Sequence, residues 1–153
     1  MGIDLFFTDG EDYGPSLDMM FLGAKHFAKR LTDSQLKSYN YCVLLDMVGD
    51  TNQDFHPEYN SERSAPLIYA AAMEINKALG YSSFKSQGAY DLLDDHICLI
   101  ERGLKIYDFI DFNYPDWNKT TDTIDKCHPD SLEAVGRTME NLVRLFPAIY
   151  GTR

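Results

Sequence analysis

Cysteine is scarce in this chain, with three residues among 153, and none of them lies in a CxxC motif. Cys42, Cys98 and Cys127 are odd in number and far apart. A disulfide framework needs an even set of cysteines, and a thiolate zinc site needs closely spaced pairs. The sequence therefore predicts reduced, mostly buried thiols and indicates neither a disulfide framework nor a thiolate zinc site.

Positive charge is also in short supply. Lys and Arg number 14 against 24 Asp and Glu, which gives a formal net charge of −10 and a pI near 4.7. A chain of this kind offers no basic patch to neutralise phosphates, which argues against nucleic acid and anionic membrane surfaces as partners. Small cations are the partners that its charge favours.

Long apolar runs are missing from the sequence as well. No run approaches the length of a membrane span, and the N-terminus lacks the basic and apolar regions of a signal peptide. The sequence therefore predicts no membrane partner, and it leaves the localisation undetermined.

Repeats, low-complexity tracts and interdomain linkers are absent too. Hydrophobic residues make up 44% of the chain and aromatic residues 13%, a composition typical of globular rather than disordered proteins. We expect a single domain over residues 1–153. Because the first apolar run begins directly after the initial Met1-Gly2, we also expect this domain to be the carboxyl-terminal portion of a larger one.

Three short apolar runs are the candidate strands, and they lack the alternation of a sheet with one solvated face. They span residues 3–7, 41–48 and 104–110. Helical periodicity predicts helices over residues 18–31, over 64–79 with Ser64 as N-cap, over 97–102, and from 129 or 131 onward. Strands that are apolar on both faces favour a parallel sheet covered by helices on both sides. We expect an α/β fold with three layers, helix/sheet/helix, and a mostly parallel sheet.

Two adjacent acids, Glu11 and Asp12, follow the first predicted strand within a Gly-bounded turn. In open α/β sheets, ligands bind beyond the carboxyl ends of strands. Neighbouring carboxylates repel each other unless a cation or a proton neutralises one of them, so the pair indicates a metal ligand beside a general base. A solvated acidic turn is an equally good interpretation. An EF-hand is excluded, because Met20 occupies the position of its bidentate Glu.

Further polar residues interrupt or border the other elements. Asp46 lies inside an apolar run, where a carboxylate is costly unless it is paired or bound to metal; the alternative is a structural Asp that caps a turn. Asp94, Asp95 and His96 open a predicted short helix, where a cap or a solvated histidine is the competing interpretation. The only tryptophan, Trp117, lies in a loop and can equally be an anchor on the core.

Taken together, five stretches resemble the zinc-dependent exopeptidase family that includes the di-zinc aminopeptidases and the glutaminyl-peptide cyclotransferases. They are residues 6–12 (FFTDGED), 44–50 (LLDMVGD), 94–97 (DDHI), 117–123 (WNKTTDT) and 130–136 (DSLEAVG). Each motif alone is weak, but their order and spacing are specific, and they cover nearly the whole chain. The resemblance implies an enzyme that acts on peptide N-termini with one or two zinc ions.

The resemblance also implies roles for individual residues. Glu11 would be the general acid/base and Asp12 a zinc ligand. Asp46 would be a ligand of the second zinc in an aminopeptidase, or a hydrogen-bond partner of the base in a cyclase. Asp94 resembles the further acid of the cyclases' proton-transfer network, and Trp117 resembles the aromatic wall of their substrate pocket.

The motif at residues 94–96 places Asp95 and His96 among the substrate-binding residues, and it is more similar to cyclases than to aminopeptidases. Two features depart from the family. Asn118 stands where the family has its final His ligand, and an amide oxygen holds zinc more weakly than imidazole. The family's first His and its bridging Asp lie in an upstream half that this sequence does not contain.

These departures lead to three expectations. The isolated chain should bind zinc weakly or not at all, and it should show no appreciable activity. A degenerate domain that serves as a binding or interaction module is the alternative to an enzyme. An open strand edge should favour a homodimer or a complementary upstream fragment as partner. Family members are often secreted or periplasmic, although nothing in this chain directs export.

Overall fold

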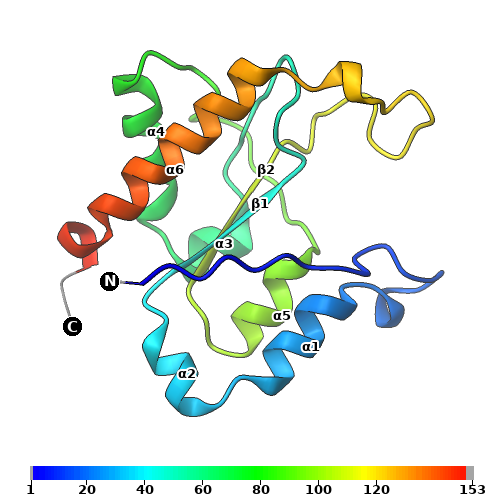
Figure 1. Ribbon diagram of the computed structural model, residues 1–153, viewed down its shortest axis with the longest axis vertical. Helices are drawn as coiled ribbons and strands as arrows, with labels where there is room; N and C mark the ends of the chain where they lie inside the picture. The colour runs from blue at the N-terminus through cyan, green and yellow to red at the C-terminus, as the bar shows by residue number, and fades with distance from the viewer. Residues whose placement is uncertain (1, 151–153) are drawn as a thin grey trace.

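The computed structural model describes residues 2–150, in which helices surround a two-stranded sheet (Figure 1). In chain order the elements are the 3-10 helix η1 (Leu17–Met19), α1 (Leu22–Arg30), α2 (Asp33–Ser38), β1 (Cys42–Asp46), α3 (Tyr59–Ser64), α4 (Ile68–Ala78), α5 (Asp95–Glu101), β2 (Ile106–Ile110), η2 (Ile124–Lys126) and α6 (Pro129–Tyr150). None of the described helices is long and apolar enough to cross a membrane.

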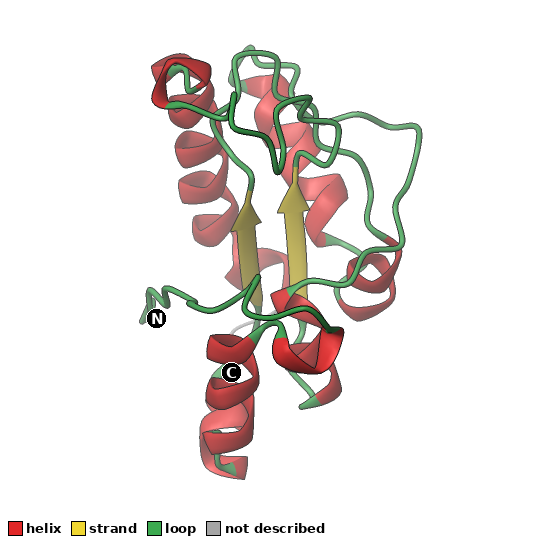
Figure 2. Ribbon diagram, turned by 90° about the vertical axis from the view of Figure 1, so that its right-hand side faces the viewer, coloured by secondary structure: helices red, strands yellow, loops and turns green. Residues whose placement is uncertain are grey.

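Strands β1 and β2 lie side by side and point the same way (Figure 2). Their register runs from Cys42 opposite Ile106 to Asp46 opposite Ile110. The parallel pairing predicted for the second and third apolar runs is therefore confirmed. Because the two strands end together, the segments that follow them both leave from the carboxyl end of the sheet.

Different helices cover the two faces of this sheet. Side chains alternate along a strand, so Val43 and Phe109 point to one face, where they join an apolar cluster with residues of α4 and α6. Leu44 and Ile106 point to the other face and pack with residues of α1 and α5. The predicted α/β fold with helices on both faces is confirmed.

The two outer edges of the sheet differ. Helix α3 covers the edge of β2, where the Ser61 hydroxyl accepts a hydrogen bond from the Asp108 N–H at 3.0 Å and the Ser64 hydroxyl accepts one from the Ile106 N–H at 3.1 Å. Within residues 2–150, β1 has no second partner strand. Leu45 of β1 remains 41% exposed. The expected open edge is thus on β1.

The buried strand expected over residues 3–7 does not form. This segment has no strand partner, and the side chains of Leu5 and Phe7 are 82% and 88% exposed. Within the segment, the ring of Phe6 stacks on Phe27 of α1 with centroids 4.3 Å apart. An apolar run becomes a strand only when a free edge pairs with it, and here it crosses the molecule as an extended coil (Figure 1).

The helix expected from Ser64 to residue 79 is two helices. Ser64 ends α3 instead of capping α4, and α4 starts at Ile68. Pro66 disfavours the helical conformation of the residue before it, and Ala65 adopts φ −143° and ψ 63°. The apolar spacing predicts a buried stripe of Leu67, Ala71, Ile75, Ala78 and Leu79, but α4 buries Ile68, Tyr69, Ala72 and Asn76 instead.

Candidate functional site

The acidic turn is held against the N-terminus of α1. The carbonyl oxygens of Asp9, Gly10 and Glu11 accept hydrogen bonds from the N–H groups of Gly23, Leu22 and Phe21 at 2.9, 3.1 and 2.8 Å. These donors have no partner inside the helix, because the first N–H groups of an α-helix point outward. The turn therefore provides acceptors for the first N–H groups of α1. The same hydrogen bonds fix the position of Glu11.

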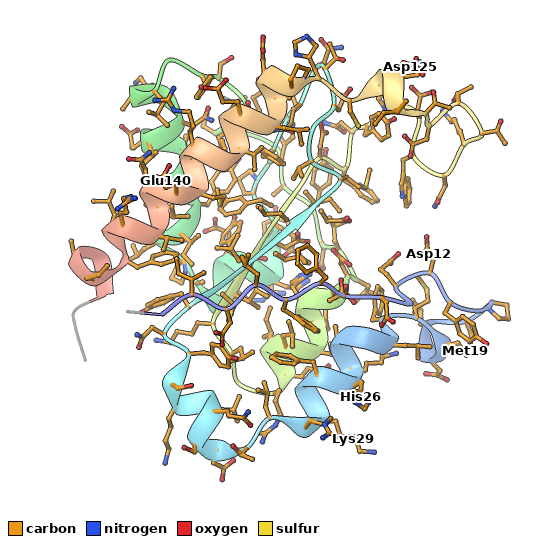
Figure 3. The ribbon with its side chains drawn as sticks, in the orientation of Figure 1. Asp12, Met19, His26, Lys29, Asp125 and Glu140 are labelled. Atoms are coloured by element: carbon orange, nitrogen blue, oxygen red, sulfur yellow. The ribbon has the colours of Figure 1, made fainter. Side chains whose placement is uncertain are left out.

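Gly23 makes this close approach possible. A Cβ atom at this position would meet the backbone of Asp9 at 2.7 Å, which is shorter than any real contact of that kind. Figure 3 draws Asp12 on the same turn, which leads into η1 and α1.

Two further carboxylates come from the sheet and from α5. Asp46 is the last residue of β1. It shares the strand face of Leu44, which packs with α1 and α5. Asp94 is the N-cap of α5, and its carboxylate accepts a hydrogen bond from the Asp95 N–H at 2.6 Å. The end of a strand and the start of a helix thus present one carboxylate each toward the side of the molecule that carries the acidic turn.

The charges of the four carboxylates act on one another. Burial and the neighbouring charge of Asp12 raise the pKa of Glu11 to about 7, with smaller contributions from Asp94 and Asp46. Burial and then the charge of Asp46 raise the pKa of Asp94 to about 6. Burial also raises the pKa of Asp46, and the charges of Asp95 and Asp12 add to the effect. At neutral pH, a carboxyl group whose pKa is about 7 can both accept and donate a proton.

Asp95 and His96 lie inside the molecule. Asp95 is 3% exposed and His96 is 0% exposed. Burial raises the pKa of Asp95, and a hydrogen bond from Thr8 in the acidic turn opposes this effect. Asp95 therefore links α5 to the acidic turn. His96, expected among the substrate-binding residues, has no surface open to solvent in this structure.

His96 instead joins two carboxylates that sequence reasoning did not select. Its Nε2 lies 3.2 Å from Glu58 and its Nδ1 lies 3.4 Å from Asp108, and all three side chains are fully buried. Burial raises the pKa of Asp108 well above its usual value, and the charges of Asp94 and Asp46 contribute. An acid inside an apolar run is the signal that singled out Asp46, and it could have found Asp108 as well. Glu58 lies in a polar loop, where no pattern marks it.

A potential ligand atom from each of Asp94, His96 and Asp108 lies within 4.8 Å of the other two. Both nitrogens of the histidine already face carboxylates, and the three side chains are 6%, 0% and 0% exposed. This group is therefore a closed network beneath the four carboxylates and not an open coordination site.

Trp117 and Asn118 lie on the loop between β2 and η2. Trp117 is 45% exposed, and its ring contacts that of Phe112, which in turn contacts Tyr90. Asn118 is exposed and has a left-handed backbone conformation with φ 56°. For the described residues, the structure records no hydrogen bond or ion pair that joins this loop to Glu11. Electrostatic interactions thus connect Glu11, Asp12, Asp46 and Asp94, and the contacts recorded for Trp117 are aromatic ones.

Known proteins share sequence and fold with this chain. The profile of peptidase family M28 matches residues 1–143, so the chain belongs to this family. The family resemblance of the five motifs is thereby confirmed. No curated protein matches the sequence significantly.

Several solved structures are similar to this chain. A glutaminyl cyclase from Fimbriiglobus ruber is 31% identical with a TM-score of 0.74, covering 82% of this chain and 44% of the other. A leucine aminopeptidase precursor from Bacteroides thetaiotaomicron is 29% identical with a TM-score of 0.77, covering 90% and 51%. A Zn-dependent exopeptidase from Parabacteroides distasonis is 28% identical with a TM-score of 0.79, covering 89% and 52%. The chain spans about half the length of these relatives.

Proposed function

We propose that this chain supplies the acid/base half of an active site for peptide N-termini, and that cyclisation of an N-terminal glutamine is its most fitting reaction. The observation that carries the proposal is the group of four carboxylates around Glu11, whose pKa is about 7. Glutaminyl cyclases among the similar structures support the substrate class. Removal of an N-terminal amino acid, the reaction of an aminopeptidase, is the second candidate, since one of the similar structures is a leucine aminopeptidase precursor.

In the cyclisation, the α-amine of the glutamine attacks its own side-chain carboxamide and ammonia leaves. The amine loses one proton and the leaving ammonia gains one, so a single group can accept the first and deliver the second. Glu11 suits this role, because its pKa of about 7 lets it exist in both forms at neutral pH. Asp94, whose own pKa is about 6, acts on Glu11 through its charge and helps to keep the pKa of Glu11 high.

The residues that can bind zinc determine whether the chain can form a complete zinc centre by itself. Of the carboxylates whose charges act on Glu11, Asp12 and Asp46 are left to hold a cation, and the mutual repulsion of the group favours a positive ion. Structural and catalytic zinc sites use at least three protein ligands, usually with imidazole or thiolate among them. The chain therefore fits a weak cation site rather than a complete zinc centre. Bound zinc would supply polarisation of the carboxamide carbonyl.

Calorimetry with zinc alone tests this site on the full chain. We expect a dissociation constant no tighter than roughly micromolar, because two carboxylates form an incomplete ligand set. Asp12→Asn should abolish the heat of binding, whereas the same change at the exposed Asp18 should not. Tight binding, or binding that Asp12→Asn leaves unchanged, would contradict the proposed ligands.

An activity assay tests the acid/base role. We expect the isolated chain to release no ammonia from an N-terminal glutaminyl peptide and no amino acid from an aminoacyl substrate, with or without zinc. Zinc-dependent turnover that Glu11→Gln abolishes would show that the chain is a complete enzyme. Turnover that Glu11→Gln leaves intact would remove Glu11 from the mechanism.

The exposed apolar segment supports a partner. Leu5 and Phe7 are mostly exposed, Leu45 of β1 is 41% exposed, and β1 has no second strand beside it within the described residues. Unpaired strand edges with apolar surroundings invite pairing with another chain. A second copy or a complementary upstream fragment would cover this surface, and the same surface would serve a chain that acts only as an interaction module. Light scattering over a concentration series tests association, and a monomer at every concentration would contradict it.

A further inference from the structure

In the buried network of Glu58, His96 and Asp108, the carboxylate of Glu58 is held in place by hydrogen bonds. One of its oxygens accepts hydrogen bonds from the Asn60 N–H, the Asn60 side-chain amide and the Leu92 N–H at 3.1, 3.0 and 3.2 Å, and the other accepts one from the Ser61 N–H at 2.7 Å. Burial alone would raise its pKa, but hydrogen bonds from His96, Ser61 and Asn60 outweigh this effect and lower it to about 2. Glu58 is therefore ionised and carries no proton to donate.

This charge decides the tautomer of His96. Its Nε2 lies 3.2 Å from an oxygen of Glu58. Two lone pairs at that distance would repel each other, and Glu58 has no proton to place between them. Nε2 must therefore carry a hydrogen, in the neutral as well as in the charged form of the ring.

The other ring nitrogen faces a different kind of carboxyl group. Nδ1 of His96 lies 3.4 Å from Asp108, which is wholly buried. In the described part of the chain, neither carboxyl oxygen of Asp108 and neither ring nitrogen of His96 has a partner within hydrogen-bond geometry, so the two ion-pair distances are the closest polar approaches recorded for the ring. Asp94, Asp46 and Glu58 place negative charge around it. A bare carboxylate is costly in these surroundings, so Asp108 either keeps its own proton or pairs with a protonated ring.

Both alternatives contain the same number of protons. In one, the Asp108 carboxyl donates to a neutral Nδ1; in the other, the proton has moved to Nδ1 and an imidazolium faces a carboxylate. The groups that face His96 are Glu58 from the segment before α3, Asp108 from β2, and Asp94 and Asp95 at the start of its own helix. The proton passes between two atoms of one pair, and the net charge of the network does not change.

We propose that His96 and Asp108 share one proton in a buried pair that Glu58 orients, and that this pair positions Asp94 at the base of the acidic site. His96 and Asp94 belong to the same turn at the start of α5, so contacts on both sides of the imidazole hold the carboxylate of Asp94 in place. His96 and Glu58 are positioning residues, since neither reaches the surface. The inference rests on the proposed function only in that Asp94 belongs to the active site.

Nitrogen-15 NMR of the histidine side chains tests the shared proton on the full chain, with a chelator present. We expect the His96 signals to keep the pattern of a ring with its hydrogen on Nε2 at every pH between about 5 and 9. A His96 whose signals change form within this range, or that carries its hydrogen on Nδ1 alone, would overturn the proposal. This readout needs no enzymatic activity, so its failure is distinct from a failure of the proposed function.

Two variants separate orientation from simple packing. Asp108→Asn keeps the shape and can donate only to Nδ1, so His96 should become the neutral Nε2–H form at every pH. Glu58→Gln removes the anion beside Nε2, so the hydrogen should move to Nδ1 and leave Asp108 charged. Glu62→Gln on α3, whose carboxylate accepts from the Tyr107 hydroxyl, is the matched control and should change nothing at His96.

The carboxyl carbon of Asp94 supplies a second readout. In Glu58→Gln the negative charge moves from residue 58 to Asp108, which faces Asp94, so the titration midpoint of Asp94 should shift upward. In Asp108→Asn this charge stays on Glu58, and the midpoint should stay close to that of the wild type. Equal shifts in both variants would indicate a structural role alone and would refute the shared proton. If Glu58→Gln does not fold, the wild type and Asp108→Asn still decide the question through the tautomer of His96.

Discussion

Replacing Asp94 by asparagine should stabilise the chain at neutral and alkaline pH while removing a proposed functional group. Asp94 is 6% exposed, and its carboxylate caps α5 through a 2.6 Å hydrogen bond from the Asp95 N–H. Asparagine is an equally good N-cap, so Asp94→Asn keeps this hydrogen bond. What the variant removes is a buried negative charge beside Asp46.

The magnitude follows from the pKa of this carboxyl. Burial and then the charge of Asp46 raise it from 3.8 to about 6 in the folded chain. Between these values the unfolded chain releases the proton while the folded chain retains it, so the free energy of unfolding decreases as the pH rises. Above about pH 6 the full effect is present, and it amounts to about 3 kcal/mol at about 1.4 kcal/mol per pKa unit. Below about pH 4 it vanishes, because both states are protonated.

Urea unfolding of Asp94→Asn and the wild type at pH 4 and pH 8, with a chelator present, measures the effect. We expect the variant to be more stable by up to about 3 kcal/mol at pH 8 and nearly equal at pH 4. Asp18→Asn, the same change at an exposed residue, should alter neither value. A variant that is less stable at pH 8, or that gains equally at both pH values, would refute the reasoning.

Three further predictions concern other parts of the molecule. Leu142→Ala should destabilise by about 2–5 kcal/mol because Leu142 is fully buried, and Leu145→Ala, at a 43% exposed side chain, should cost less than about 1 kcal/mol in the same urea assay. Asn118→His should tighten zinc binding in calorimetry, and an unchanged affinity would mean that residue 118 does not face the site. Leu5→Asp combined with Phe7→Asp should abolish concentration-dependent association in light scattering, and persistent association would locate the interface elsewhere.

Local patterns were sufficient for several elements of the fold. The apolar runs around Leu44 and Phe109 form the two parallel strands, and the apolar spacing after residue 129 corresponds to α6. Signals of this kind need only near neighbours in the chain, because strand alternation and helical periodicity are properties of a few consecutive residues. The acids next to these elements, Glu11, Asp46 and Asp94, could be selected for the same reason.

Other features depend on partners that are distant in sequence. Residues 3–7 have the composition of a strand, yet a strand requires a neighbouring edge, and none pairs with them in the described residues. One proline, Pro66, causes the break between α3 and α4. Its effect on the backbone of Ala65 outweighs the helical pattern of the sequence, which continues through this position. A local sequence pattern indicates which secondary structure a segment favours, but a segment forms a strand only when another strand pairs with it.

The sequence by itself determined the family and the parallel α/β order, and it was enough to select the acids proposed for the site, because these reside in short motifs and in periodicity. Only the tertiary structure decided that Asp108 and Glu58 enclose His96, since the three side chains come from β2, from the loop before α3 and from α5. Burial also decided their charges: the same carboxyl group is ionised in Glu58, where four donors meet it, and favours its proton in Asp108, where carboxylates surround it. Neither the number of donors nor the dielectric surroundings of a side chain is encoded by its neighbours in the chain.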